Sequence, residues 1–130
     1  MTNSHLRLLD ANLNRLREGI RVVEDIYRYI FNNKKTATQL KNLRHNSRID
    51  IYHELLNSRD IKNDVLKTST TSEQSREDIN SILIANFKRA QESSRVLEEF
   101  GKLINSEVSE NFKSIRYDLY HLEKNIQKDI

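Results

Sequence analysis

The chain has no cysteine, no proline and no tryptophan, and it has only two glycines. Without cysteine it can form neither a disulfide framework nor a thiolate metal site, which fits a reducing cytoplasm. Sheets need many turns, and turns favour Gly and Pro, so this shortage together with 32% charged residues indicates long helices. No apolar run approaches the roughly 18 residues of a membrane span, and no signal-peptide core follows the N-terminus. We therefore expect a soluble, cytoplasmic, all-α protein with no membrane partner.

Charge is nearly balanced along the sequence. There are 22 basic and 19 acidic residues, which give a net charge of +3 with the two signs interspersed. Proteins that follow a nucleic-acid backbone usually carry a basic block or tail, and the sequence contains neither. We expect no nucleic-acid partner. A length of 130 residues suits a single domain, residues 1–130, with a core of modest size.

Apolar residues recur at helical spacing in four segments. The segments are about 5–32, 36–57, 73–105 and 107–128, and their candidate N-caps are Asn3 or Ser4, Thr36 or Thr38, Thr71, and Ser106. Asn32 and Asn33 are expected to end the first helix, because Asn tolerates the left-handed conformation. Residues 58–72 have no period, and so long a loop inside a compact domain is often functional.

Two helices repeat as a unit. The run NLNRLREGIRVVED at 12–25 returns as NFKRAQESSRVLEE at 86–99, an offset of 74. The run LKNLRH at 40–45 returns as FKSIRY at 112–117, an offset of 72. The repeat units are 12–57 and 86–129, joined through the loop 58–72. A duplicated helical hairpin of this kind predicts four long helices in a four-helix bundle with a pseudo-twofold axis.

Polar residues recur together with the apolar pattern, although a helix needs only the apolar positions to form a core. At 100° per residue, each repeated helix carries a polar stripe that is separate from its apolar stripe. The polar members of the stripe are Arg15, Glu18 and Asp25 in the first copy and Arg89, Glu92 and Glu99 in the second. Arg21, which recurs as Arg95, flanks the stripe, and Asn12 and Asn86 also match. Val22 and Val96 lie within the stripes, which favours a face covered by the loop or by a second subunit of a homodimer.

Two interpretations of the polar stripes stay open. If the twofold brings them together, four carboxylates converge and repel one another, and a hard cation such as Mg²⁺ relieves that repulsion. Four arginines among them suit phosphate oxygens. Carboxylates, arginines and Mg²⁺ together are typical of sites for nucleotide and diphosphate substrates. The alternative is a pair of solvated helix faces stabilised by Glu–Arg pairs, with the identity left over from a duplication.

Several long runs closely resemble one known family. They are LLDANLNRLREGIRVVEDIYRY, LKNLRH, the loop's SRD and NDV, SEQSRED, and NFKRAQESSRVLEEFGKL, which together cover essentially the whole chain. The family is a helical domain found alone or fused ahead of thiamin-phosphate synthase, and it is described as a monofunctional hydroxymethylpyrimidine phosphate kinase. The resemblance implies transfer of the γ-phosphoryl group of ATP to hydroxymethylpyrimidine phosphate with Mg²⁺ as cofactor, and functional association with thiamin-phosphate synthase.

The resemblance also implies roles for the recurring residues. It assigns metal binding to Glu18, Asp25, Glu92 and Glu99, phosphate binding and catalysis to Arg15, Arg21, Arg89 and Arg95, and substrate binding to Asn12, Asn86, Asp60 and Asp64. One position departs from the family pattern, because Leu66 stands where the family has Gly after the loop's Asp-Val. Glycine there would let the backbone approach a phosphate closely.

Two other functions stay open from the sequence. One is a Mg²⁺-dependent, all-α nucleotide pyrophosphohydrolase, although such enzymes use clustered ExxE-type motifs and Glu18 and Glu24 are six positions apart. The other is a non-catalytic ligand-binding module of the thiamin pathway. The products distinguish these functions, since transfer releases ADP and hydrolysis releases AMP and pyrophosphate.

Overall fold

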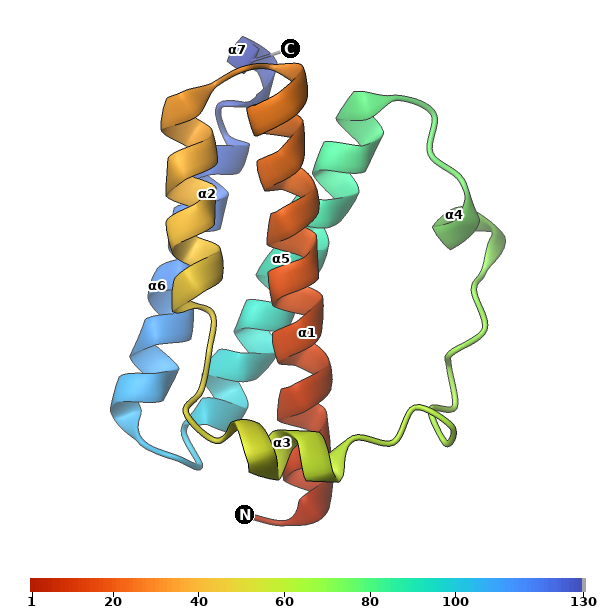
Figure 1. Ribbon diagram of the computed structural model, residues 1–130, viewed down its shortest axis with the longest axis vertical. Helices are drawn as coiled ribbons and strands as arrows, with labels where there is room; N and C mark the ends of the chain where they lie inside the picture. The colour runs from red at the N-terminus through yellow and green to blue at the C-terminus, as the bar shows by residue number, and fades with distance from the viewer. Residues whose placement is uncertain (130) are drawn as a thin grey trace.

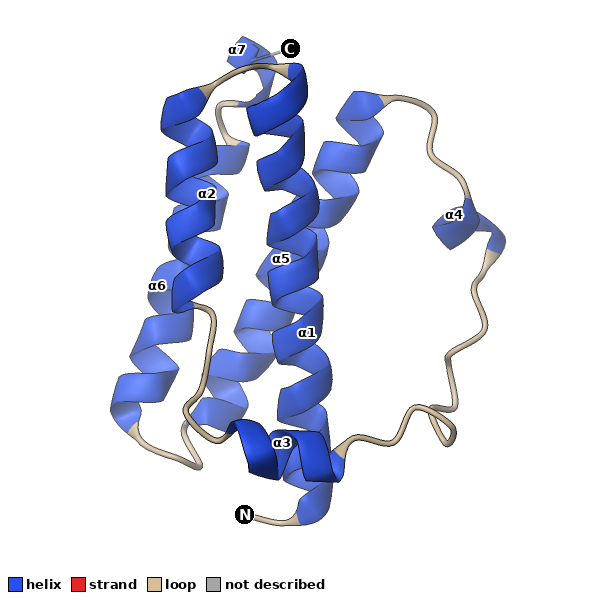
Figure 2. Cartoon of the chain, in the orientation of Figure 1, coloured by secondary structure: helices blue, strands red, loops and turns tan. Residues whose placement is uncertain are grey.

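Four helices pack side by side in a bundle. A computed structural model describes residues 1–129, and the side chains of Ser72 and Gln127 lie outside that description. The bundle helices are α1 (Asn3–Asp25), α2 (Lys34–Asn46), α5 (Ile79–Gly101) and α6 (Ser106–Glu123). Shorter elements are the π-helix η1 (Ile26–Ile30), α3 (Tyr52–Ser58), α4 (Thr71–Gln74) and α7 (Ile126–Asp129). Within the described residues there is no strand, and the all-α prediction is confirmed (Figure 1, Figure 2).

The first helix forms for reasons that are visible in its sequence. The Thr2 hydroxyl accepts a hydrogen bond from the backbone N–H of His5, and Nδ1 of His5 accepts one from the backbone N–H of Thr2, which closes a capping box. The helix continues directly into η1, whose wider turn closes with a bond from Phe31 N to Ile26 O of 3.1 Å. Asn32 then takes φ 52°, the left-handed conformation that ends the helix as predicted.

The core lies between α1, α5 and their partner helices. α1 packs chiefly on α5, α5 on α6, and α1 on α2. The largest side chains that are almost completely buried are Tyr27, Phe87 and Phe112. α1 and α5 approach closely, because a Cβ built on Gly19 would lie 3.1 Å from Asn86 O. None of the described helices combines the length and the apolar character that a membrane crossing needs.

The second predicted helix, 36–57, is wrong as a single element. The chain leaves helical geometry after α2, and the Ser47 hydroxyl donates to Leu43 O at 2.6 Å, a local bond that competes with helix continuation. A side chain of α6 caps the C-terminal end of α2, since Asn111 Nδ2 donates to Asn46 O at 3.0 Å. After the break, α3 turns to pack against α1, and its apolar residues Tyr52 and Leu56 are exposed.

The predicted ends of the third and fourth helices also shift. Residues 73–74 belong to the short α4, whose capping box joins Thr70 and Glu73 in place of the predicted Thr71. α5 begins only at Ile79 because Asp78 caps it through Ser81 N. In the last hairpin Asn105, one residue before the predicted Ser106, is the N-cap, and α6 ends at Glu123.

Candidate functional site

The loop 59–70 encloses a depression on one side of the bundle, next to α1 and α5. It leaves α3 beside the N-terminal end of α1 and rises toward α4 away from the helices (Figure 1). Two adjacent cavities lie between this loop and the bundle, with volumes of about 450 and 800 Å³. Both are lined by Asn12, Arg15, Ile61 and Asp64, so they are neighbouring parts of one depression. We call the two cavities together the basin.

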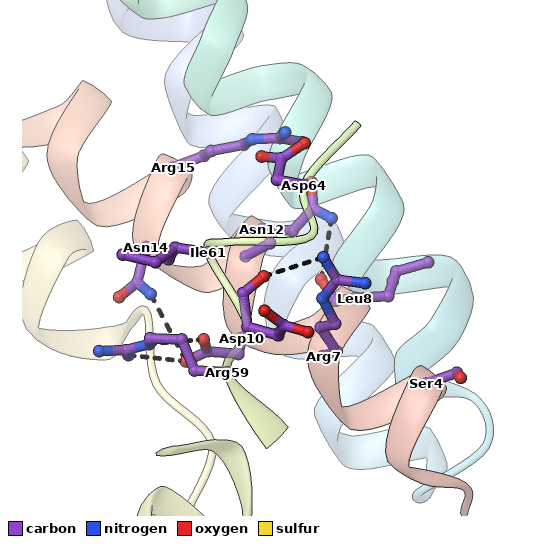
Figure 3. A pocket seen from close by; sticks show the side chains of 12 residues that line it. Ser4, Arg7, Leu8, Asp10, Asn12, Asn14, Arg15, Arg59, Ile61 and Asp64 are labelled. Carbon is purple, nitrogen blue, oxygen red and sulfur yellow. Dashed lines mark hydrogen bonds and ion pairs between the residues drawn. The ribbon is translucent and has the colours of Figure 1, made fainter. Parts of the chain in front are cut away.

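An ion pair holds the first residue of the loop, Arg59, against α1. Arg59 donates to both carboxylate oxygens of Asp10, at 2.8 and 2.9 Å, and Asp10 is only 6% exposed (Figure 3). The hydrogen bonds to Asp10 raise the pKa of Arg59. Arg7 donates to Asp60 O at 2.9 Å, a second tie to the loop. These contacts fix where the loop starts, and they use Asp10 and Arg59 structurally.

Asp60 shapes the next turn of the loop. Its carboxylate accepts from Asn63 Nδ2 at 2.7 Å and from Asn63 N at 3.2 Å. These hydrogen bonds hold the pKa of Asp60 below its ordinary value. Asp64 makes a similar local bond with Leu66 N at 3.0 Å. Leu66 is 85% exposed and its φ is not positive, so the loop backbone there does not need glycine.

Side chains from three parts of the chain line the larger cavity. α1 contributes Asn12 and Arg15; α5 contributes Arg89, Glu92, Ser93 and Val96; the loop and α4 contribute Ile61, Lys62, Asp64, Leu66, Lys67 and Glu73. Arg15 extends from α1 toward the loop that carries Asp64 (Figure 3). Within the described residues no carboxylate lies within 4.0 Å of Arg15 or Arg89. Both guanidinium groups are therefore free to bind an anion.

The structure thus brings six of the twelve predicted site residues to the basin: Asn12, Arg15, Asp60, Asp64, Arg89 and Glu92. The expected convergence of four carboxylates is wrong. α1 and α5 are antiparallel and cross near Gly19 and Ala90, so Asp25 and Glu99 lie about 22 Å apart along the bundle at 1.5 Å per residue. Within the described part of the chain, no three Asp, Glu or His residues are grouped so that they could hold a metal.

The predicted residues at the helix ends pair within their own helices. Arg21 lies 3.3 Å from Asp25, and Arg95 lies 2.8 Å from Glu99, as in ordinary solvated i,i+4 pairs. Lys102, at 2.8 Å, lowers the pKa of Glu99 by its hydrogen bond and charge, with a further contribution from Arg95. The solvated-face interpretation therefore describes these four residues. The roles assigned to them, and to Glu18 and Asn86, stay predictions.

Two buried ion pairs account for another part of the recurrence. Glu24, 2% exposed, accepts from Arg44 at 2.7 and 3.2 Å, and the pKa of Arg44 is raised by these bonds. Glu98, 7% exposed, accepts from Arg116 at 2.8 and 3.2 Å, which raises the pKa of Arg116. Both pairs join a long helix to its hairpin partner. Both residues of the pair recur in the sequence, at the repeat offsets of 74 and 72. Recurrence alone, however, does not distinguish a buried ion pair from a ligand site.

The geometry defines an all-α bundle with an anion-compatible basin bounded by two antiparallel helices and a long loop. A family model described as the ThiD2 family matches residues 7–125, and the chain belongs to that family. The chain is 40% identical over 129 residues to the thiamine-phosphate synthase of Rhodopirellula baltica and 41% identical over 121 residues to that of Thermosynechococcus vestitus, covering 92% and 91% of this chain. It spans about a third of the length of these curated relatives, 34% in both cases. No solved structure matches.

Proposed function

We propose that this chain is a phosphotransferase of thiamin biosynthesis that phosphorylates hydroxymethylpyrimidine phosphate at the expense of ATP. Membership of the ThiD2 family and the similarity to proteins named thiamine-phosphate synthase support the pathway. One structural observation supports the reaction class: Arg15 and Arg89, which have no ion-pair partner among the residues that the structure describes, line the same cavity. Phosphoryl transfer demands chiefly positioning and charge neutralisation, which paired guanidinium groups supply.

The reaction balances without a protein base. The bond between the γ-phosphorus and its bridging oxygen breaks, and ADP leaves with that oxygen. A new bond forms between the γ-phosphorus and an oxygen of the acceptor phosphate, which is already anionic near neutral pH. Arg15 and Arg89 hold the phosphate oxygens and stabilise the charge on the transferred group. The apolar side chains of Ile61, Leu66 and Val96 line the same cavity and offer an apolar surface to the pyrimidine ring or the nucleotide base.

The carboxylates of the basin fit Mg²⁺ bound together with substrate. Mg²⁺ is usually held by one or two carboxylates and by substrate phosphates, with no need for a closed protein cage. Asp64 on the loop and Glu92 on α5 line the larger cavity and would hold it. Mg²⁺ neutralises the negative charge of nucleotide phosphates. A pyrophosphohydrolase, which uses clustered carboxylates, fits this arrangement less well, given the lack of a three-carboxylate group among the described residues.

The relatives indicate how the product is used. Because this chain matches about a third of proteins named thiamine-phosphate synthase, we propose that its diphosphate product passes to a synthase, in a separate chain or a fused one. Cytoplasmic location and a homodimer are part of the same proposal.

The decisive assay follows ADP release from ATP and Mg²⁺ with and without hydroxymethylpyrimidine phosphate, and the pyrimidine diphosphate by mass spectrometry. We expect ADP and diphosphate in equal amounts, only when the pyrimidine is present. AMP with pyrophosphate would instead indicate hydrolysis. Tight binding of the pyrimidine without consumption of ATP would leave a non-catalytic module.

Matched arginine variants test the site within this assay. Arg15→Gln and Arg89→Gln are expected to lower kcat/KM at least about tenfold, which corresponds to ~1.4 kcal/mol of transition-state stabilisation. Arg17→Gln is the control, because Arg17 is also exposed on α1 but lines a different depression, beside α3. Equal activity in all three variants would remove the basin from the reaction.

A further inference from the structure

The pseudo-twofold axis relates side-chain contacts as well as helices. The buried pair Glu24–Arg44 in the first hairpin has its counterpart in Glu98–Arg116 in the second. Asn12 Nδ2 donates to Leu8 O at 3.0 Å, and Asn86 Nδ2 donates to Ile82 O at 2.9 Å. Each amide keeps its Oδ1 as an acceptor. Equivalent residues thus keep equivalent geometry across the molecule.

The axis passes between α1 and α5 near the two free arginines. Gly19 of α1 meets Asn86 and Ala90 of α5, while Asn12 of α1 shares a cavity with Val96 of α5. The twofold exchanges Gly19 with Ser93 and Asn12 with Asn86. It also exchanges Arg15 with Arg89, and both side chains line the same cavity. The arginine pair therefore lies where the two halves of the molecule meet.

Each half of the α1–α5 face carries the same side chains. The covered half-site consists of Asn12, Glu92 and Val96 next to the arginine pair, below the loop. The twofold generates an open half-site of Asn86, Glu18 and Val22 on the other side of that pair. The difference between the halves is the cover, because Val96 shares its cavity with residues of the loop, whereas Val22 is 38% exposed.

We propose that the open half-site binds the second substrate of the reaction, so that two phosphorylated ligands meet at Arg15 and Arg89. This inference rests on the proposed phosphotransferase function. Donor and acceptor both carry phosphate, and a duplicated Asn–Arg–Glu set offers each of them an amide, a guanidinium and a carboxylate. Transfer needs the reacting oxygen and phosphorus about 3–3.5 Å apart, and a shared arginine pair on the axis brings phosphates together.

The charged residues of each half-site indicate which ligand it binds, the nucleotide or the monophosphate. On the covered side the loop and α4 add two cations, Lys62 and Lys67, and two carboxylates, Asp64 and Glu73. Additional cations and carboxylates suit a triphosphate with its Mg²⁺. The open half-site has none of these additions from the loop, and it is left for the monophosphate. There the carboxylate of Glu18 and the free Oδ1 of Asn86 can accept hydrogen bonds from the amino group of the pyrimidine ring.

The two glutamates that the twofold exchanges, Glu18 and Glu92, provide the test. Glu18→Gln and Glu92→Gln replace two exposed carboxylates with an amide of the same shape. Calorimetric titrations would measure binding of hydroxymethylpyrimidine phosphate, and separately of a non-hydrolysable ATP analogue with Mg²⁺. We expect Glu18→Gln to weaken the monophosphate about tenfold and the nucleotide less than about twofold, with the reverse for Glu92→Gln. Glu110→Gln, on an exposed part of α6, is the control and should change neither.

Each other outcome overturns the inference in a specific way. If both variants weaken the same ligand, the basin is a single site. If Glu18→Gln changes neither affinity, the open half-site binds nothing, and if the preferences are exchanged, the charge assignment is wrong. Because binding is measured for each ligand alone, the result does not depend on turnover. A working kinase without the split would keep the proposed function and remove the second half-site.

Discussion

Glu24 and Glu98 are carboxylates buried against arginine in a small protein. Taking both charges out of water is unfavourable, and the pair is tolerated because its hydrogen bonds are short and complementary. Replacing one residue of the pair and replacing both are therefore expected to have different effects on stability. Removing one partner leaves an unpaired buried charge, whereas replacing both with apolar residues can be nearly neutral.

Arg44→Met is therefore expected to destabilise the protein by about 3 kcal/mol, since it strands the Glu24 carboxylate. The double variant Glu24→Leu with Arg44→Met should recover most of that loss. Urea unfolding followed by circular dichroism measures both free energies. A loss below about 1 kcal/mol in the single variant would show that the pair is solvated in the protein.

Tyr27 couples stability to alkaline pH. It is completely buried and donates to Asp129 at 2.8 Å, and burial followed by the Asp129 carboxylate raises its pKa well above the ordinary value. Above pH ~10 the unfolded phenol loses its proton while the folded one keeps it, so the free energy of unfolding falls as pH rises.

The variant Tyr27→Phe removes this titration. Between about pH 9.5 and 11 its free energy of unfolding should fall less steeply than that of the wild type, by up to ~1.4 kcal/mol per pH unit. The slope is the measured quantity, because loss of the hydrogen bond also changes stability at every pH. Parallel slopes in urea unfolding would contradict the assignment.

At the scale of elements, the close approach of α1 and α5 depends on Gly19. A mid-helix glycine costs about 1 kcal/mol in helix propensity, and here the reason is the neighbouring backbone, because a Cβ added at Gly19 would lie 3.1 Å from Asn86 O. Ser93, the equivalent residue, is buried and turns its hydroxyl to Arg89 O in its own helix. The duplicated helices are therefore alike in fold and different at their closest contact.

Gly19→Val should force the two helices apart and destabilise the protein by more than about 2 kcal/mol. Arg17→Val is the matched control, because it places the same β-branched residue on the exposed face of α1 and should cost less than about 1 kcal/mol. Thermal and urea unfolding of the two variants give the comparison. Similar losses would mean that helix propensity, rather than packing, explains the glycine.

At the scale of the whole molecule, the connection between the hairpins has more length than it needs. Residues 59–78 must pass from α3 to the far end of α5, a distance close to the roughly 35 Å length of that helix. Twenty extended residues reach roughly 66 Å. The surplus lets the loop bow outward (Figure 1) and leaves Ile61, Val65 and Leu66 between 74% and 94% exposed.

Exposed apolar residues that line a ligand site should affect binding and not stability. Ile61→Ser and Leu66→Ser are expected to change the free energy of unfolding by less than about 0.5 kcal/mol and to weaken nucleotide binding about fivefold. Val65→Ser is the control, since Val65 is exposed on the same loop without lining the basin. Unchanged affinity in all three variants would show that the loop does not contact the ligand.

The sequence by itself determined the all-α class and indicated the duplication, because apolar spacing and the shortage of turn residues act locally along the chain. Recurrence of polar identity also singled out Asn12, Arg15, Arg89 and Glu92, which the structure places in the basin and whose roles stay predictions. Only the tertiary structure decided how the stripes meet: antiparallel helices bring residues near the axis together and separate Asp25 from Glu99. The break before α3, the Asp10–Arg59 tie and the buried glutamate pairs likewise depend on partners far along the chain, which no local pattern contains.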